Sequence, residues 1–180
     1  IIFIIPYRDR IQHRYFFDTY MKHILEDENN YEIYYAEQKD TMPFNRGAMK
    51  NIGFIAMKEK YKKDYKNITF VFNDIDCVPY KKNLLDYTTT KGNIKHFYGH
   101  KNILGGIISI KGEDFEKMNG YPNYWTWGYE DNILGVRAKK KNIHIGYSVF
   151  YKINDPNILH FYHGSKRIHD ISLKIVDNDN

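Results

Sequence analysis

The sequence predicts an α/β fold in which a mainly parallel central sheet is flanked by helices. Apolar runs rich in β-branched and aromatic residues alternate with segments whose apolar residues recur at helical spacing. The resulting order of strand, helix, strand, helix and strand is typical of parallel α/β units. A length of 180 residues suits one domain with its own core. Because the chain opens on an apolar run, we expect residues 1–180 to be a single domain cut from a longer protein.

The first half of the chain alternates regularly between the two kinds of element. In order, we expect a strand at 1–6, a helix at 9–27, a strand at 31–37, a helix at 45–61 and a strand at 67–73. The first of these, IIFIIP, is apolar throughout, which is typical of a strand buried on both faces of a sheet. Asn45 suits the N-cap of the second helix, because its side chain can accept a backbone hydrogen bond.

The second half is less regular and richer in turn-forming residues. In order, we expect a strand at 102–112, a short helix at 113–119, an aromatic loop at 121–131, a helix at 130–141 and short strands at 142–147 and 157–163. The helix at 130–141 begins with two acids, which the N-terminus of a helix favours.

The composition narrows the class of partner. The net charge is +5, and the lysines are scattered in runs such as KEKYKKDYK rather than gathered in one stripe. We interpret these runs as solvated helix faces, and the mild positive charge by itself fits a small molecule that carries phosphate as well as a nucleic acid. We expect no nucleic-acid partner and no membrane contact from this segment. Cys77 is the only cysteine in the sequence, so no internal disulfide can form and no oxidising compartment is required.

Two aspartates follow the strand expected at 67–73, in the stretch FVFNDIDCVP. In open α/β sheets, ligands bind beyond the carboxyl ends of the strands, and alternate residues of an extended segment point the same way. Asp74 and Asp76 can therefore face one ligand together, and their hard oxygens suit Mn²⁺ or Mg²⁺ with diphosphate oxygens beside them. The alternative is that both are turn residues leading into Pro79.

A pair of histidines near the C-terminus offers further metal ligands. His160 and His163 stand three residues apart in HFYH, a spacing that can bring both rings to one side of a turn. Imidazole binds manganese, iron and zinc. The alternative is two surface histidines whose hydrogen bonds are satisfied by their surroundings.

The stretch WTWGYED combines aromatic and acidic residues. Glu130 and Asp131 follow a loop that contains a glycine and two tryptophans. Aromatic faces commonly line sugar and nucleotide sites, and a carboxylate beside them can accept a proton from a sugar hydroxyl. The alternative is that the two acids only complement the helix dipole.

Three arginines lie near the ends of the expected strands: Arg8 and Arg10 in PYRDR, and Arg46 in FNRG. The forked guanidinium group matches the oxygens of phosphate. The alternatives are exposed charges at a helix start for the first two residues and a salt bridge for Arg46.

Taken in order, these stretches resemble the catalytic domain of the β1,4-galactosyltransferase family, glycosyltransferase family 7. The matching blocks are IIPYRDR, FNRGAMKNIGF, FVFNDIDCVP, LGGIISIKGEDFEKMNGYPNYWTWGYEDN and HFYH, which run from residue 2 to 163 in the order of the family. The resemblance implies a GT-A fold, a divalent metal, and transfer of a galactose-type sugar from a UDP-sugar to an acceptor hydroxyl with inversion at the anomeric carbon.

The resemblance also implies roles for the acids and histidines. Asp76 and His163 match metal ligands of the family, and His160 falls where many relatives place a methionine or histidine ligand. Asp131 matches the catalytic base, and Glu130 matches its neighbour that holds the sugars. The implied cofactor is Mn²⁺, with Mg²⁺ as the alternative.

Further positions match the segments of the family that bind the donor. Trp127 matches the tryptophan of a mobile loop that closes over the donor. The donor and nucleotide contacts implied by position are Pro6, Tyr7, Arg8, Arg10, Phe44, Arg46, Asp74, Ile75, Ile103 and Gly106. The lysine that relatives place near the diphosphate has no clear match between Tyr80 and Gly99, and Lys95 is the nearest guess.

The donor is expected to be UDP-Gal or UDP-GalNAc, and the acceptor a carbohydrate or glycoconjugate. Ile103 stands where galactose-preferring relatives often have tyrosine, and a smaller side chain leaves room for an acetamido group, so we expect UDP-GalNAc to be tolerated. Relatives are usually Golgi-anchored, whereas the absence of disulfides suggests a cytoplasmic or viral setting. The competing functions are a non-catalytic module that binds UDP-sugars or glycans, and a metal-dependent nucleotide-sugar pyrophosphatase.

Overall fold

The computed structural model describes residues 1–162 of the chain. Its elements follow in the order β1 (Ile2–Tyr7), α1 (Ile11–Ile24), β2 (Glu32–Glu37), α2 (Arg46–Lys60), β3 (Thr69–Asn73), β4 (Cys77–Pro79), β5 (Asn93–Gly99), β6 (Ile107–Lys111), α3 (Gly112–Lys117), α4 (Glu130–Lys140), β7 (His144–Gly146), β8 (Tyr151–Lys152) and β9 (Ile158–His160). The regular alternation expected for the first half is confirmed. The side chain of Asn45 accepts a hydrogen bond from the backbone N–H of Ala48, as expected of an N-cap.

The central sheet is mixed but mainly parallel. Its strand order is β2-β1-β3-β6-β5-β7, with β8 also paired to β5. Strand β1 is parallel to β2 and β3, and β5 is parallel to β7 and β8. Strand β6 runs antiparallel between β3 and β5. A second, short ladder pairs β4 with β9 in antiparallel fashion.

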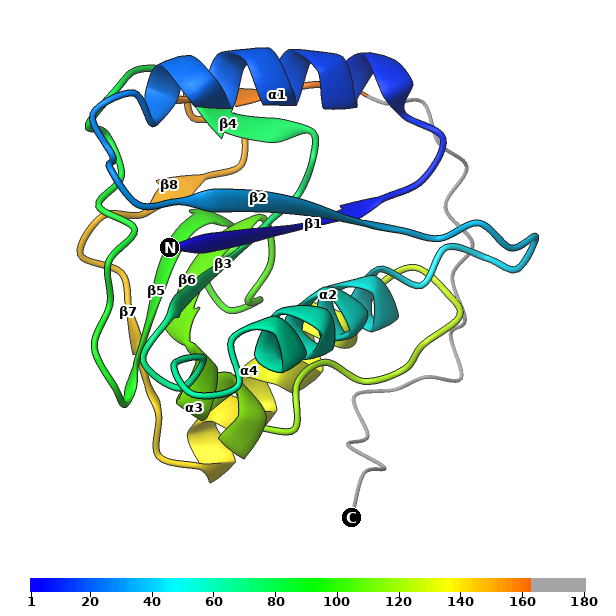
Figure 1. The fold of residues 1–180 in the computed structure, drawn as a ribbon, viewed down its shortest axis with the longest axis vertical. Coiled ribbons are helices and arrows are strands. Elements are labelled where there is room, and N and C mark those ends of the chain that lie inside the picture. The colour runs from blue at the N-terminus through cyan, green and yellow to red at the C-terminus, as the bar shows by residue number, and fades with distance from the viewer. Residues whose placement is uncertain (163–180) are drawn as a thin grey trace.

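Helices cover both faces of the sheet, as Figure 1 shows: α1 lies on one side, and α2, α3 and α4 lie on the other. Each face carries its own apolar cluster. Along β1, Ile2 and Ile4 belong to the cluster under α2, whereas Phe3 and Ile5 belong to the cluster under α1. Because alternate side chains point to opposite faces, a strand covered on both sides must be apolar throughout, which explains the run IIFIIP.

The largest difference from the expected fold lies in the middle of the chain. Strands β4, β5 and β8 were not predicted, and β6 begins at Ile107 rather than at 102. Strand β5, NIKHFYG, contains Lys95 and His96 and shows no clean alternation of apolar and polar residues, so its pairing with β6 depends on tertiary context. The helix expected at 9–27 is shorter, because Asp9 adopts a left-handed conformation (φ 47°) before it and the polar run EDENN follows it.

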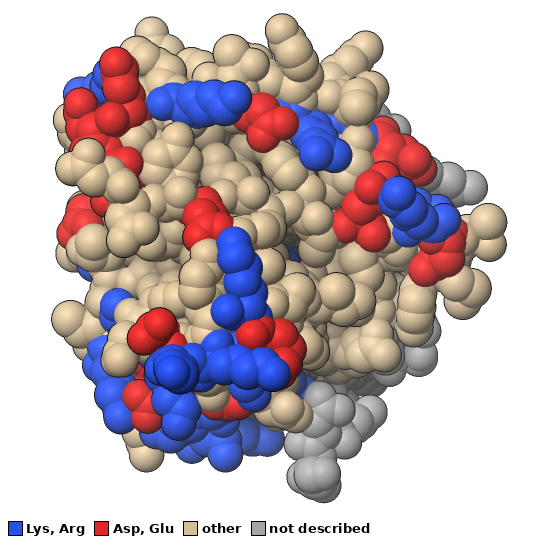
Figure 2. Space-filling view, viewed as in Figure 1, with Lys and Arg blue, Asp and Glu red and all other residues tan. Residues whose placement is uncertain are grey.

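The surface charges behave as the sequence predicts. The lysine-rich end of α2 pairs with acids at the surface: Lys58 with Glu116, and Lys60 with Glu32. Figure 2 shows lysines, arginines and acids interleaved on one face of the molecule rather than separated into a single basic stripe. Among the described residues, none of the helices is long and apolar enough to cross a membrane.

Candidate active site

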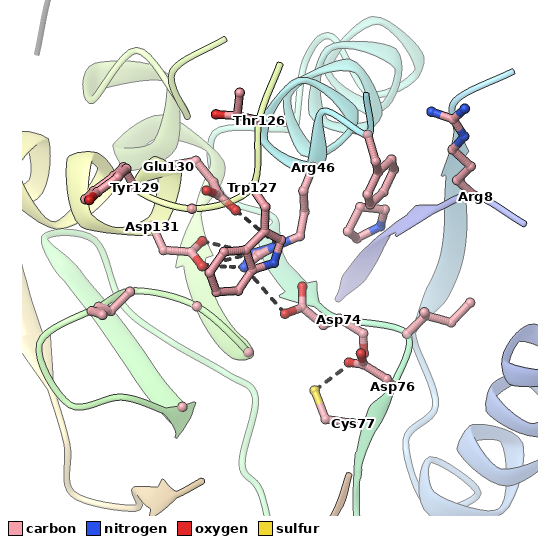
Figure 3. A pocket seen from close by; sticks show the side chains of 18 of the residues that line it. Arg8, Arg46, Asp74, Asp76, Cys77, Thr126, Trp127, Tyr129, Glu130 and Asp131 are labelled. Carbon is pink, nitrogen blue, oxygen red and sulfur yellow. Dashed lines mark hydrogen bonds and ion pairs between the residues drawn. The ribbon is translucent and has the colours of Figure 1, made fainter. Parts of the chain in front are cut away.

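A cavity of about 990 Å³ opens beyond the carboxyl ends of β1 and β3. Its walls come from segments far apart in the sequence: the ends of these strands, the approach to α2, the glycine pair before β6, and the loop that leads into α4 (Figure 3). Its position follows the general rule for ligand sites in open α/β sheets. Its size lies at the upper end of the range of roughly 300–1,000 Å³ that is usual for small-molecule sites.

Most of the residues singled out from the sequence line this cavity. They are Pro6, Arg8, Arg10, Phe44, Arg46, Asp74, Ile75, Asp76, Ile103, Gly106, Trp127, Glu130, Asp131 and His160. The arrangement supports the interpretation of Asp74 and Asp76 as site residues rather than as turn residues alone.

Two of the residues considered from the sequence do not line the cavity, and a third is not described by the structure. Tyr7 does not line the cavity, because side chains alternate along β1 and its ring turns into the core beside Tyr35, with 5% of its surface exposed. Lys95 also lies outside the cavity, where its ammonium pairs with Asp86 at 2.8 Å. His163 lies outside the described residues.

Arg46 lies at the centre of the site and joins three carboxylates. Its Nη1 donates to both carboxylate oxygens of Asp131 at 3.1 and 2.9 Å, and its Nη2 also contacts that carboxylate. Its Nε lies 3.3 Å from Glu130 Oε1. Its Nη2 lies 3.5 Å from Asp74 Oδ2. Figure 3 shows the guanidinium pointing between the start of α4 and the end of β3, so one arginine connects the acidic motifs of DID and WTWGYED.

Local backbone structure holds this arrangement. The Asn45 cap places Arg46 in the first turn of α2, and the same amide donates to Asn123 in the aromatic loop. At the end of that loop, Gly128 and Tyr129 have φ of 104° and 67°, a left-handed turn that delivers Glu130 and Asp131 to the N-terminus of α4.

The glycine pair before β6 allows the chain to pass close to the acids. A Cβ on Gly105 would lie 2.3 Å from Asp131 Oδ2, so only glycine fits there without displacing the carboxylate. Gly106 has a φ of 71°, and its carbonyl accepts a hydrogen bond from the backbone N–H of Asp74 at 3.0 Å. Gly106 was predicted as a donor contact from the sequence, whereas Gly105 was not.

Burial and neighbouring charges shift the pKa values of Asp131 and Asp74 in opposite directions. Burial raises the pKa of Asp131 to about 6, although the cations Arg46 and Lys50 oppose the shift. Burial also acts on Asp74, but there Arg46 and Lys50 outweigh it and hold the pKa below its usual value. Asp131 is therefore suited to take up a proton near neutral pH, whereas Asp74 stays ionised.

Asp76 and His160 are brought together by the β4–β9 ladder, in which Cys77 pairs with His160. The His160 Nε2 atom lies 4.0 Å from Asp76 Oδ1. The other ring nitrogen, Nδ1, is hydrogen-bonded to the hydroxyl of Tyr98 at 2.7 Å. This bond leaves Nε2 directed toward Asp76, the arrangement that metal-binding histidines commonly show.

The donor set of one carboxylate and one imidazole fits Mn²⁺. Ligand atoms about 2.1 Å from a shared ion can lie up to about 4.2 Å apart, so the observed spacing lets one ion contact both side chains. Within residues 1–162, no group of three or more potential metal-binding side chains is formed. The third predicted ligand, His163, is the residue just beyond that range.

The fold and the cavity define the chain as a domain of the GT-A glycosyltransferase type. The crystal structure of the catalytic domain of Drosophila β1,4-galactosyltransferase 7 in complex with xylobiose matches 94% of this chain and 74% of that chain, with a TM-score of 0.77 and 26% identity. A complex of a mutant of the same Drosophila protein with manganese, UDP-Gal and xylobiose matches with a TM-score of 0.74 and 24% identity, over 90% of this chain and 70% of that one.

Two family models divide the chain between them. The N-terminal region of glycosyl transferase group 7 matches residues 1–88, and the N-terminal domain of galactosyltransferase matches residues 88–164. The chain belongs to this family of galactosyltransferases, glycosyl transferase group 7.

Curated relatives agree with the assignment. Xylosylprotein 4-beta-galactosyltransferase of Caenorhabditis elegans is 28% identical over 98% of this chain, and beta-1,4-galactosyltransferase 7 of Drosophila melanogaster is 31% identical over 79% of it. Human beta-1,4-galactosyltransferase 6 is 31% identical over 81% of the chain. The chain spans 63%, 45% and 39% of the lengths of these relatives.

Sequence reasoning missed two side chains that complete the site. Tyr98, which holds His160, lies on the unpredicted strand β5. Lys50, whose ammonium lies behind Asp74 and Asp131, is one turn after Arg46 on α2. The spacing of four residues from Arg46 was a signal, because residues i and i+4 share one face of a helix.

Proposed function

We propose that this chain is a metal-dependent inverting glycosyltransferase that moves galactose or N-acetylgalactosamine from a UDP-sugar to the hydroxyl of a carbohydrate acceptor. The observation that carries the proposal is the convergence, in one cavity, of a buried Asp131 with the Asp76–His160 pair and Arg46. These groups provide a base, ligands for a metal and a cation for phosphate. Two further facts support the proposal: its relatives are named galactosyltransferases, and the Drosophila protein was crystallised with manganese, UDP-Gal and xylobiose.

The chemistry follows from where the groups lie. The acceptor oxygen attacks the anomeric carbon from the face opposite UDP, the bond from that carbon to the phosphate oxygen breaks, and UDP leaves with the electron pair. Asp131 takes the proton of the acceptor hydroxyl. Arg8, Arg10 and Arg46 line the same cavity and offer guanidinium groups to the diphosphate. Asp76 and His160, with His163 as the resemblance implies, would hold a Mn²⁺ ion, which would supply further positive charge for the leaving group.

Glu130 and Trp127 are placed to hold the sugars and exclude water. The Glu130 Oε2 atom is buried and has no hydrogen-bond partner within the described residues, so a sugar hydroxyl can donate to it. The Trp127 side chain is 44% exposed at the cavity. A Cβ on Gly128, the glycine that follows it, would meet no other atom within 4 Å. The open space at Gly128 supports the expectation that this loop closes over the donor, which would protect the donor from hydrolysis.

A donor screen tests the function. UDP-Gal, UDP-GalNAc, UDP-Glc, UDP-GlcNAc and UDP-GlcA are each incubated with Mn²⁺ or Mg²⁺, and released nucleotide is measured. We expect release of UDP from both UDP-Gal and UDP-GalNAc. Ile103 lines the cavity, and its side chain is smaller than the tyrosine of galactose-preferring relatives, which leaves room for the acetamido group. Turnover of UDP-Gal with none of UDP-GalNAc would contradict the donor prediction. Release of UMP and sugar phosphate would instead indicate a pyrophosphatase.

The Tyr98→Phe substitution tests the metal site. It removes the hydroxyl that holds His160 Nδ1, and loss of such a partner typically weakens metal binding about 10- to 100-fold. We expect the Kd for Mn²⁺, measured by calorimetry or by electron paramagnetic resonance, to rise by about tenfold.

Tyr87→Phe is the matched control. Tyr87 is also buried, but its hydroxyl has no hydrogen-bond partner within the described residues, so its removal should leave the Mn²⁺ affinity unchanged. An equal Mn²⁺ affinity in the wild type and in Tyr98→Phe would show that Tyr98 does not contribute to metal binding.

A further inference from the structure

Lys50 is a buried cation behind the acids of the site. It lies in the second turn of α2, and its side chain is 1% exposed. Its Nζ atom lies 3.5 Å from Asp74 Oδ1 and 3.7 Å from Asp131 Oδ1. On its other side, Nζ lies 4.8 Å from the centroid of the Tyr121 ring. The ammonium therefore bridges the acid that follows β3 and the acid that opens α4.

A lysine that is buried in this way needs partners that offset the cost of removing its charge from water. Burial of an ammonium group disfavours its charged form strongly, unless carboxylates lie beside it. The other lysines near the end of α2, such as Lys58 and Lys60, keep their ammonium groups at the surface. A methionine would fill the space of Lys50 beneath the helix without the desolvation of a charge. The positive charge of Lys50 is thus explained by its contacts with Asp74 and Asp131 and not by the packing of its side chain.

Lys50 and Arg46 contact the same two acids but differ in access. Arg46 lines the cavity, whereas Lys50 does not. A donor diphosphate that enters the cavity can draw the Arg46 guanidinium toward its oxygens and away from Asp131. Lys50 cannot follow, because it is enclosed between α2 and the acids. After such a movement, Lys50 is the cation that remains beside the base.

We propose that Lys50 is a positioning residue for sugar transfer, which ties the base Asp131 to Asp74 from behind the cavity and keeps the base charged and oriented while Arg46 engages the donor. The inference rests on the proposed function of Asp131, and it assigns Lys50 no contact with substrate.

The expected change in pH dependence follows from the charges around Asp131. Arg46 and Lys50 face it from α2, Glu130 from α4, Asp74 from the end of β3 and Tyr121 from the loop before α4. Loss of the Lys50 charge disfavours the carboxylate form of Asp131, so its pKa rises. The acidic limb of the profile of kcat/KM against pH must then move to higher pH.

The experiment compares Lys50→Met and Lys50→Arg with the wild type, with Lys58→Met as a surface control on the same helix. We expect Lys50→Met to lower kcat about 10- to 100-fold and to move the acidic limb up by about one pH unit, with the KM for the UDP-sugar changed less than about threefold. Lys50→Arg should restore most of kcat and the wild-type limb. Lys58→Met should match the wild type. If Lys50→Met does not fold, Lys50→Gln makes the same comparison, because it also lacks the charge.

A double substitution separates a role through Asp131 from a general effect. In the Asp131→Asn background, Lys50→Met should cause no further loss of kcat, because the group on which it acts is gone. The inference is overturned if folded Lys50→Met keeps the wild-type kcat and pH profile, or if Lys50→Arg is as impaired as Lys50→Met. A wild-type chain that turns over no donor would overturn the proposed function itself, which is distinguishable because the failure appears before any substitution.

Discussion

The Asp131→Asn substitution is expected to lower kcat for sugar transfer by about 10²–10⁴-fold, the usual contribution of a general base. The amide cannot accept the proton of the acceptor hydroxyl, although it keeps the shape of the buried side chain. It also removes a negative charge beside Arg46, so the affinity for UDP should stay the same or increase. Transfer is measured as UDP release with an acceptor, and UDP affinity by calorimetry.

Asp86→Asn is the control for this substitution, because Asp86 is an exposed aspartate that pairs with Lys95 away from the cavity. It should leave both quantities unchanged. Full transfer activity in Asp131→Asn would remove Asp131 as the base and would direct attention to Glu130, the other buried acid at the start of α4.

The Asp76→Asn substitution is expected to lower activity by a similar factor, but through weaker metal binding. Replacement of the carboxylate leaves a neutral ligand of lower affinity beside His160. We expect the Kd for Mn²⁺ to rise by about 100-fold or more, and activity at fixed Mn²⁺ to fall by about 10³-fold.

A titration of activity against Mn²⁺ distinguishes this effect from the loss of a base. In Asp76→Asn, a high Mn²⁺ concentration should recover part of the activity, whereas in Asp131→Asn it should recover none. An unchanged Mn²⁺ affinity in Asp76→Asn would contradict the assignment of this aspartate as a ligand.

The parts of the fold that could be predicted are those set by local pattern. Strands β1 and β3 are covered on both faces, so β1 and the centre of β3, from Phe70 to Phe72, are apolar runs that are easily recognised. Helix α2 has a helical period and a capping asparagine. Strand β5 could not be recognised, because its place in the sheet is fixed by antiparallel pairing with β6 and not by its own pattern.

In the candidate site too, residues set by local pattern could be predicted and residues set by tertiary contacts could not. Residues at strand ends and helix starts, such as Asp74, Arg46 and Asp131, could be predicted because the carboxyl ends of neighbouring parallel strands meet at one edge of the sheet. The contacts of Tyr98 and Lys50 could not, since each acts on a partner from a distant element: Tyr98 on His160 of β9, and Lys50 on the first turn of α4. For Lys50, the spacing from Arg46 indicates only the shared face of α2 and not the partner. Such contacts depend on register and packing, which a single sequence does not display.

The most direct test of the central claim is a nuclear magnetic resonance time course of UDP-Gal or UDP-GalNAc with Mn²⁺ and a panel of acceptors that end in xylose, glucose or N-acetylglucosamine. We predict that UDP appears together with an equal amount of β-linked product, because attack from the face opposite UDP inverts the α-anomer of the donor. A chelator should stop both. An α-linked product would contradict the inverting mechanism. Binding of UDP and Mn²⁺ without any product or hydrolysis across all donors would contradict the assignment of this chain as a transferase.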